Sequence, residues 1–98
     1  MNRSEAIHSL LKVVAYELLQ FIREQEASAK DRWVPAAGIK TALKLNFEAV
    51  PKGGTQRGEK GWLFAIIARI LEDDGLVEHK KVGNRAFYRT KRSTRDGE

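Results

Sequence analysis

The hydrophobic period of the chain changes once, at Gly75, and this change restricts the fold more than any other feature of the sequence. Before Gly75, apolar residues recur at three- and four-residue steps, the spacing of one face of an α-helix. After it, residues 76–82 and 85–90 are rich in strand formers, and Gly83-Asn84 between them is typical of a tight hairpin turn. The chain of 98 residues is therefore predicted to be mainly α-helical, with one small β-hairpin near its C-terminal end.

The first predicted helix covers residues 4–27. Asn2 or Ser4 can cap its start, and Asn2 with Glu5 has the spacing of a capping box, in which each side chain accepts a hydrogen bond from the other residue's backbone. The core stripe of this helix consists of Ile7, Leu10, Leu11, Val14, Leu18, Phe21 and Ile22, and Val13, Tyr16 and Leu19 lie beside the stripe. Because the residues beside the stripe are apolar as well, we expect the N-terminal helix to form the interface of a homodimer.

Two shorter helices are predicted to follow. The second covers residues 35–45 and begins at Pro35, whose fixed φ suits a first helical turn. The third covers residues 57–74 and ends at Gly75, because glycine readily adopts the left-handed conformation that stops a helix. The predicted core residues are Ile39, Ala42 and Leu43 in the second helix and Leu63, Ile66, Ile67, Ile70 and Leu71 in the third, with Trp62 and Phe64 at the margin.

Composition and charge limit the environment and the partners. No apolar run reaches the roughly 20 residues that cross a bilayer, and the chain has no cysteine, so we expect a cytoplasmic protein without disulfides, thiolate zinc or a membrane span. The net charge is +5, and seven Lys and Arg residues but no acidic residue lie between Lys80 and Arg95. Such a block is expected to meet a polyanion. We predict one domain over residues 1–90 and a polar, basic, disordered tail over residues 91–98.

The end of the third helix and the hairpin carry a resemblance to a known family. Ile70-Leu71, the acidic pair Asp73-Asp74, the run from Gly75 to Glu78 and a basic hairpin ending in Tyr88-Arg89 resemble winged helix-turn-helix regulators of the broad MarR-like and ArsR-like type. In that family the recognition helix ends in Leu-x-x-x-Gly-Leu-Val, and the first strand of the wing starts there. The resemblance spans about residues 34–89 and implies a three-helix winged-helix domain that binds DNA.

Basic and polar residues gather at the two places where such a domain would meet DNA. A helix fits the major groove, where Arg and Gln side chains can pair with guanine and adenine edges. We expect DNA contacts from Lys52, Thr55, Gln56, Arg57 and Lys60 at the start of the third helix, and from Lys80, Lys81, Arg85 and Arg89 in the hairpin. Contacts at both places would hold a duplex, so the leading prediction is a DNA-binding transcriptional regulator, with Tyr88 docking the hairpin on the core.

Two other functions remain open at this point. The outward face of the third helix is expected to combine Gly58, Gly61, Ala65 and Ala68 with Arg69 and Glu72. Small residues allow another backbone to come close, so a winged-helix module that binds a protein through this face is the first alternative. The second is a nucleic-acid-binding protein with little sequence preference. The family also joins its second and third helices by a short turn, whereas residues 46–57 form a longer connection here.

Catalytic and metal-binding patterns are absent from the sequence. His8 and His79 are far apart and neither belongs to a cluster with ligand spacing. The glycines at positions 53, 54, 58 and 61 lack the Lys-Ser/Thr that a phosphate-binding loop requires. No nucleophile stands beside a base, so we expect no enzymatic activity, no cofactor and no metal. The acidic residues 72–74 are expected to pair locally with Arg69 or with hairpin lysines.

Overall fold

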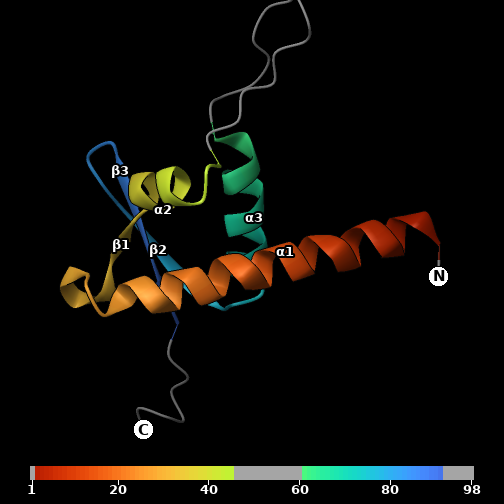
Figure 1. Ribbon diagram of the computed structural model, residues 1–98, viewed down its shortest axis with the longest axis horizontal. Helices are drawn as coiled ribbons and strands as arrows, with labels where there is room; N and C mark the ends of the chain where they lie inside the picture. Colours follow the sequence, from red (N-terminus) through yellow and green to blue (C-terminus); the bar gives the residue numbers. More distant parts are fainter. Residues whose placement is uncertain (1, 46–60, 92–98) are drawn as a thin grey trace, which may run out of the picture.

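The computed structural model describes residues 2–45 and 61–91, which form three α-helices and a small three-stranded antiparallel sheet (Figure 1). The elements are α1 (Arg3–Glu26), the 3-10 turn η1 (Lys30–Arg32), β1 (Val34–Pro35), α2 (Ala36–Ala42), α3 (Trp62–Asp73), β2 (Val77–Val82) and β3 (Arg85–Thr90). The strand order is β1-β3-β2. The prediction of a mainly helical domain with a small hairpin is confirmed, and the sheet has one strand more than predicted. No helix within the described ranges has the length and apolar character needed to cross a bilayer.

The start of α1 is fixed by the predicted capping box. The Asn2 side chain accepts a hydrogen bond of 2.8 Å from the Glu5 backbone N–H, and the Glu5 carboxylate accepts one of 3.1 Å from the Asn2 backbone N–H. These two bonds satisfy backbone donors that have no partner inside the helix. The sequence therefore encodes a helix that begins at Arg3, at the far tip of α1.

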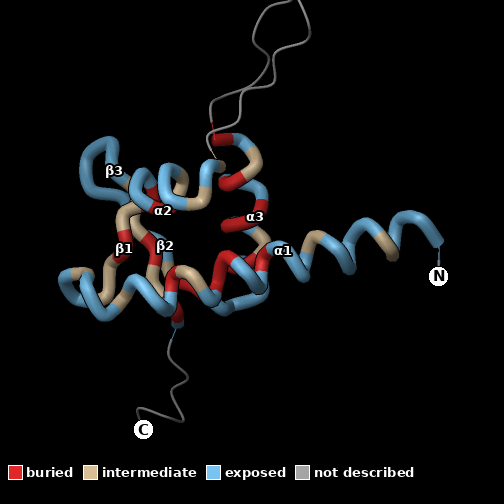
Figure 2. The backbone as a smooth tube through the Cα atoms, in the orientation of Figure 1, coloured by how far each residue is buried: buried red, intermediate tan, exposed pale blue. Residues whose placement is uncertain are grey.

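The core covers only the C-terminal half of α1, which corrects part of the predicted stripe. Leu18 and Ile22 are buried as predicted, but Ile7, Leu10 and Val14 are exposed, and Leu19, predicted to lie beside the stripe, is 1% exposed. The reason is that α3 and the sheet pack mainly on the second half of α1, where Figure 2 shows the buried turns and where the buried residues are Ala15, Leu18, Leu19 and Ile22.

A two-residue strand stands before α2, where the sequence predicted the start of a helix. Val34 pairs with Tyr88 and Pro35 with Phe87, so β1 adds an edge strand to the hairpin. Pro35 is extended (φ −65°, ψ 130°) and precedes α2, which begins at Ala36 and ends at Ala42, short of the predicted residue 45. Proline has no N–H and is tolerated at a sheet edge. Ala36 and Ile39 face the core, whereas Ala42, predicted to be buried, is exposed.

The buried face of α3 is rotated from the predicted one. Phe64, Ile67, Ala68 and Leu71 are buried at positions i, i+3, i+4 and i+7, and Ile66, predicted to lie in the core, is 48% exposed. The Phe64 ring packs edge-on against the Tyr88 ring, with centroids 5.5 Å apart, and this contact turns Phe64 inward.

The predicted stop of α3 at Gly75 is confirmed. Gly75 has a left-handed φ of 72°, its N–H bonds the Glu72 carbonyl, and the Leu76 N–H bonds the Leu71 carbonyl at 2.9 Å. This pair of bonds is the Schellman arrangement, which satisfies the last carbonyls of a helix. The chain leaves it directly into β2 at Val77.

A polar anchor joins the end of α1 to β3. The Glu26 carboxylate accepts hydrogen bonds from the Thr90 backbone N–H and, at 2.6 Å, from the Thr90 hydroxyl. It also pairs with Arg32 at 3.3 Å, and Arg32 donates to the Thr90 carbonyl at 3.2 Å. The three side chains are largely buried, so each relies on the others to satisfy its polar atoms.

Candidate nucleic-acid interface

The predicted hairpin forms with the predicted turn. Val82 pairs with Arg85 across Gly83-Asn84, and the register continues from Val77 opposite Thr90. Gly83 has a positive φ of 62°, a conformation that glycine adopts at little cost and that two-residue hairpin turns require. We call β2, this turn and β3 the wing.

Strand alternation divides the cations of the wing between the two faces of the sheet. Successive side chains of a strand point to opposite faces. The outer face carries Glu78, Lys80, Val82, Arg85, Phe87 and Arg89, and the inner face, which packs on the helices, carries Val77, His79, Lys81, Ala86, Tyr88 and Thr90. Lys81 therefore lies on the opposite face of the sheet from the three cations with which it was predicted to act, Lys80, Arg85 and Arg89.

On the outer face, cations alternate with aromatic rings. The Arg89 guanidinium lies 4.1 Å and the Lys80 ammonium 4.7 Å from the Trp33 ring centroid. Lys80 and Arg85 also lie 5.6 and 5.9 Å from the Phe87 ring centroid. Each ring face attracts positive charge, which offsets part of the repulsion among the three cations. The position of Trp33 on this face was not predicted, because it depends on the pairing of β1 with β3, which are distant in the sequence.

The four predicted wing cations differ in whether they form ion pairs and hydrogen bonds within the domain. Arg89 donates to the Glu78 carboxylate at 2.6 Å and to the Asp31 carbonyl at 3.1 Å, so its charge is largely committed inside the domain. No ion pair within the described residues engages Lys80, Lys81 or Arg85. These three cations are therefore the ones that an external anion can reach.

The inner face joins the wing to α2 and α3. Tyr88 is buried against Phe64, as predicted for a residue that docks the wing, and this burial, with a smaller contribution from Glu72, raises the pKa of the Tyr88 hydroxyl. A hollow of about 200 Å³ opens between α2, the start of α3 and β3, and Lys40 lies at its rim over the Phe64 ring. Lys40 therefore adds to this side a cation for which the sequence predicted no role.

The residues predicted to read DNA from the start of α3 lie outside the described residues; they are Lys52, Thr55, Gln56, Arg57 and Lys60. The described part begins at Gly61, whose φ of 85° is left-handed, and continues into α3. Its exposed face combines Trp62, Ala65, Ile66 and Arg69, so this part of the helix offers more apolar than polar surface.

The small-residue face expected on α3 is mostly turned inward. Ala68 is 1% exposed and Gly61 is buried, which leaves Ala65 as the described member of that set on the surface. The cause is the rotation of the helix by the contact between Phe64 and Tyr88. A continuous groove of small residues is therefore excluded for Gly61, Ala65 and Ala68 as a docking surface.

The acidic end of α3 forms local ion pairs. Asp73 pairs with Arg69 at 2.9 Å, as predicted, and Asp74 pairs with Lys12 of α1 at 3.7 Å. Arg69 is fully exposed, and its bond to Asp73 raises the pKa of the guanidinium. No cluster of three or more metal-ligating side chains occurs within residues 2–45 and 61–91.

We compared the chain with models of protein families, with curated proteins and with solved structures, and none of them matches it. A functional assignment therefore depends on the charge and shape of the surfaces described above.

Proposed function

We propose that the protein is a winged-helix regulator that binds duplex DNA in the cytoplasm through the start of α3 and through the wing. The observation that carries the proposal concerns Lys80, Lys81 and Arg85. These three cations lie on a hairpin of two six-residue strands, and no carboxylate of the described residues forms an ion pair with them. Desolvating or crowding like charges is unfavourable unless a polyanion neutralises them. A DNA backbone supplies that charge at every phosphate.

The order of the elements supports the same proposal. The wing follows α3 after a single turn at Gly75, and its inner face packs on α3 through Tyr88 and Phe64. A helix in the major groove and a hairpin on the neighbouring backbone could therefore act together. In this arrangement Lys81 and Lys40, on the side of the helices, and Arg85, at the tip, contact phosphates, and the residues predicted before α3 contact base edges.

The first test removes two wing cations that the fold does not use. We expect Lys81→Ala with Arg85→Ala to weaken duplex binding about tenfold and to make the slope of log K against log salt less negative by about 1.8, since each lost phosphate contact changes that slope by about 0.9. The measurement is fluorescence anisotropy with labelled duplex at several salt concentrations. The matched control, Arg3→Ala with Arg23→Ala, removes the same charge from exposed positions on α1 that form no ion pair among the described residues.

An affinity and a slope equal to those of the control pair would reject the wing as a DNA contact. Selection of duplexes from a random pool then distinguishes a regulator from a protein with little sequence preference. Enrichment of one motif supports the regulator, and a pool that stays random supports the non-specific alternative.

A protein-binding module is the second candidate, and one observation favours it. Trp62 is 39% exposed and Ile66, one helical turn later, is 48% exposed on α3. Exposed aromatic and aliphatic side chains at this spacing suit a hydrophobic contact better than a contact with phosphate. Replacing both by Lys would strengthen DNA binding if α3 faces DNA, and would abolish partner binding if α3 faces a protein.

The proposal includes a homodimer formed through α1. One small module buries little DNA surface, and regulators of this kind gain affinity from two half-sites. The support within the chain is the row of exposed apolar residues on one face of α1, namely Ile7, Leu10 and Val14.

A further inference from the structure

The N-terminal part of α1 is a helical arm whose residues up to Val14 are exposed or half-buried, and among the described residues its ion pair with the body joins Lys12 to Asp74. α1 has 24 residues and is about 36 Å long, and its first turns extend past α3 (Figure 1). The buried positions of α1 begin at Ala15, and the turns before it are exposed or half-buried (Figure 2). An isolated helix of about 12 residues is marginal in water, yet the capping box at Asn2 and Glu5 specifies this helix up to its tip. We therefore expect the apolar side of the arm to pack against another surface.

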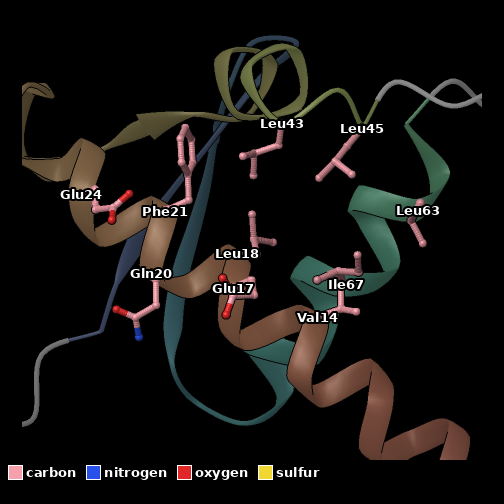
Figure 3. A pocket seen from close by; sticks show the side chains of 10 residues that line it. All are labelled: Val14, Glu17, Leu18, Gln20, Phe21, Glu24, Leu43, Leu45, Leu63 and Ile67. Atoms are coloured by element: carbon pink, nitrogen blue, oxygen red, sulfur yellow. The ribbon is translucent and has the colours of Figure 1, made fainter.

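The arm carries a row of apolar residues that continues into a groove. Ile7 and Leu10 are 57% and 65% exposed. Further along the same face of α1, Val14, Leu18 and Phe21 form one wall of an apolar groove of about 340 Å³ (Figure 3). Its other walls come from the end of α2 and from α3, namely Leu43, Leu45, Leu63 and Ile67. The same apolar stripe is therefore exposed on the arm at one end and forms a wall of the groove at the other.

The spacing of that stripe is symmetric about Val14. Leu10 and Leu18 are four residues on either side of it, and Ile7 and Phe21 are seven residues on either side. An antiparallel pair of identical helices related by a two-fold axis brings together residues at equal distances from the axis. With the axis at Val14, Leu10 of one copy lies opposite Leu18 of the other, which lines the groove but is itself buried, and Ile7 meets the half-buried Phe21. The stripe is self-complementary in this register.

From this symmetry we infer that a second copy of the chain covers the arm, with the two α1 helices antiparallel and crossing at Val14. Each arm lies along the groove of the other copy, so Ile7 and Leu10 enter the groove beside Phe21 and Leu18. The two contacts are equivalent and the assembly closes as a dimer. The inference deepens the homodimer of the proposed function and rests on it.

Cysteine crosslinking tests the register directly, since the natural chain has no cysteine. A disulfide needs Cα atoms about 4.4–6.8 Å apart. We expect full-length Val14→Cys to form a disulfide-linked dimer under mild oxidation. Two matched variants should not crosslink: Val13→Cys, which is exposed but turned by about 100° on the helix, and Ile7→Cys, whose two copies would lie about 21 Å apart along the axis.

Sedimentation equilibrium tests the arm itself. Leu10→Glu removes an apolar contact and adds a charge twice in a symmetric dimer, so we expect the dimer dissociation constant to rise at least about a hundredfold. Val13→Glu, the control for the added charge, should leave it within about threefold, because Val13 lies off the interface stripe.

The outcomes separate the parts of the proposal. A wild-type chain that stays monomeric at every concentration rejects the dimer, whether or not it binds DNA. A dimer in which Val13→Cys crosslinks as fast as Val14→Cys, or in which Leu10→Glu has no effect, rejects this register and leaves the dimer in place. A dimer with the predicted crosslink and no affinity for DNA supports the inference and rejects the DNA-binding function.

Discussion

The two halves of α1 share one apolar stripe but differ in their environment. In the C-terminal half, Leu18 and Ile22 are buried against α3 and the sheet, and the Glu26 anchor ties the end of the helix to β3. In the N-terminal half, Ile7 and Leu10 continue the same stripe but are exposed. Hydrophobic periodicity specifies which face of a helix is apolar, and it leaves open whether the chain itself or a second molecule covers that face.

The largest effect should come from truncating the stripe on each side of this boundary. Ile22→Ala leaves a cavity among fully buried residues, so we expect it to lower the free energy of unfolding by about 2–5 kcal/mol. The matched change Ile7→Ala on the arm should lower it by no more than about 0.5 kcal/mol. Urea denaturation followed by circular dichroism measures both, at protein concentrations low enough that dimer formation does not contribute.

Equal losses in the free energy of unfolding for Ile22→Ala and Ile7→Ala would contradict this difference, because they would mean that the arm belongs to the folding unit of a single chain. A loss for Ile7→Ala that grows with protein concentration would show that a second copy covers the arm, since a dimer interface stabilises by mass action.

The second effect concerns the polar anchor of the C-terminal half. Glu26→Ala leaves the Thr90 N–H and the Arg32 guanidinium without their acceptor in a largely buried place. We expect a loss of about 1–3 kcal/mol in the free energy of unfolding. Glu24→Ala, two residues earlier on an exposed position, is the matched control and should change it by less than about 0.5 kcal/mol. Urea is the suitable denaturant, because guanidinium chloride would screen the ion pair.

If Glu26→Ala and its control were equally stable, the contacts of Glu26 with Arg32 and Thr90 would contribute nothing net. The end of α1 would then be held by apolar packing alone, as at Ile22.

Local interactions explain most of what the sequence predicted. The capping box at Asn2, the stop at Gly75 and the Gly83-Asn84 turn each involve residues within a few positions of one another, so their signals are readable in the chain. Strand alternation could also have separated Lys80 from Lys81, because neighbouring residues in a strand face opposite sides.

Contacts between distant segments explain what the sequence did not reveal. The pairing of Val34 with Tyr88 turns a predicted helix start into a strand, and the contact of Phe64 with Tyr88 rotates α3 and buries Ala68. The stack of Arg89 on Trp33 likewise joins residues more than fifty positions apart. Such contacts depend on how the elements dock, which the periodicity of a single element does not determine.

The smallest effect should come from the cap at the tip of the arm. Asn2→Ala removes the side chain that accepts from the Glu5 N–H, and loss of an N-cap costs a helix about 1 kcal/mol. In a monomer this cost falls on a segment that frays locally, so global unfolding should change by less than about 0.5 kcal/mol while amide hydrogen exchange in residues 3–10 becomes several times faster. In the inferred dimer both arms are held and the cap is lost twice, so the same substitution should instead weaken dimerisation by about 25-fold, the equivalent of about 2 kcal/mol. Exchange rates that stay unchanged at both low and high protein concentration would show that the cap does not hold the arm, and that its helix has another source of stability.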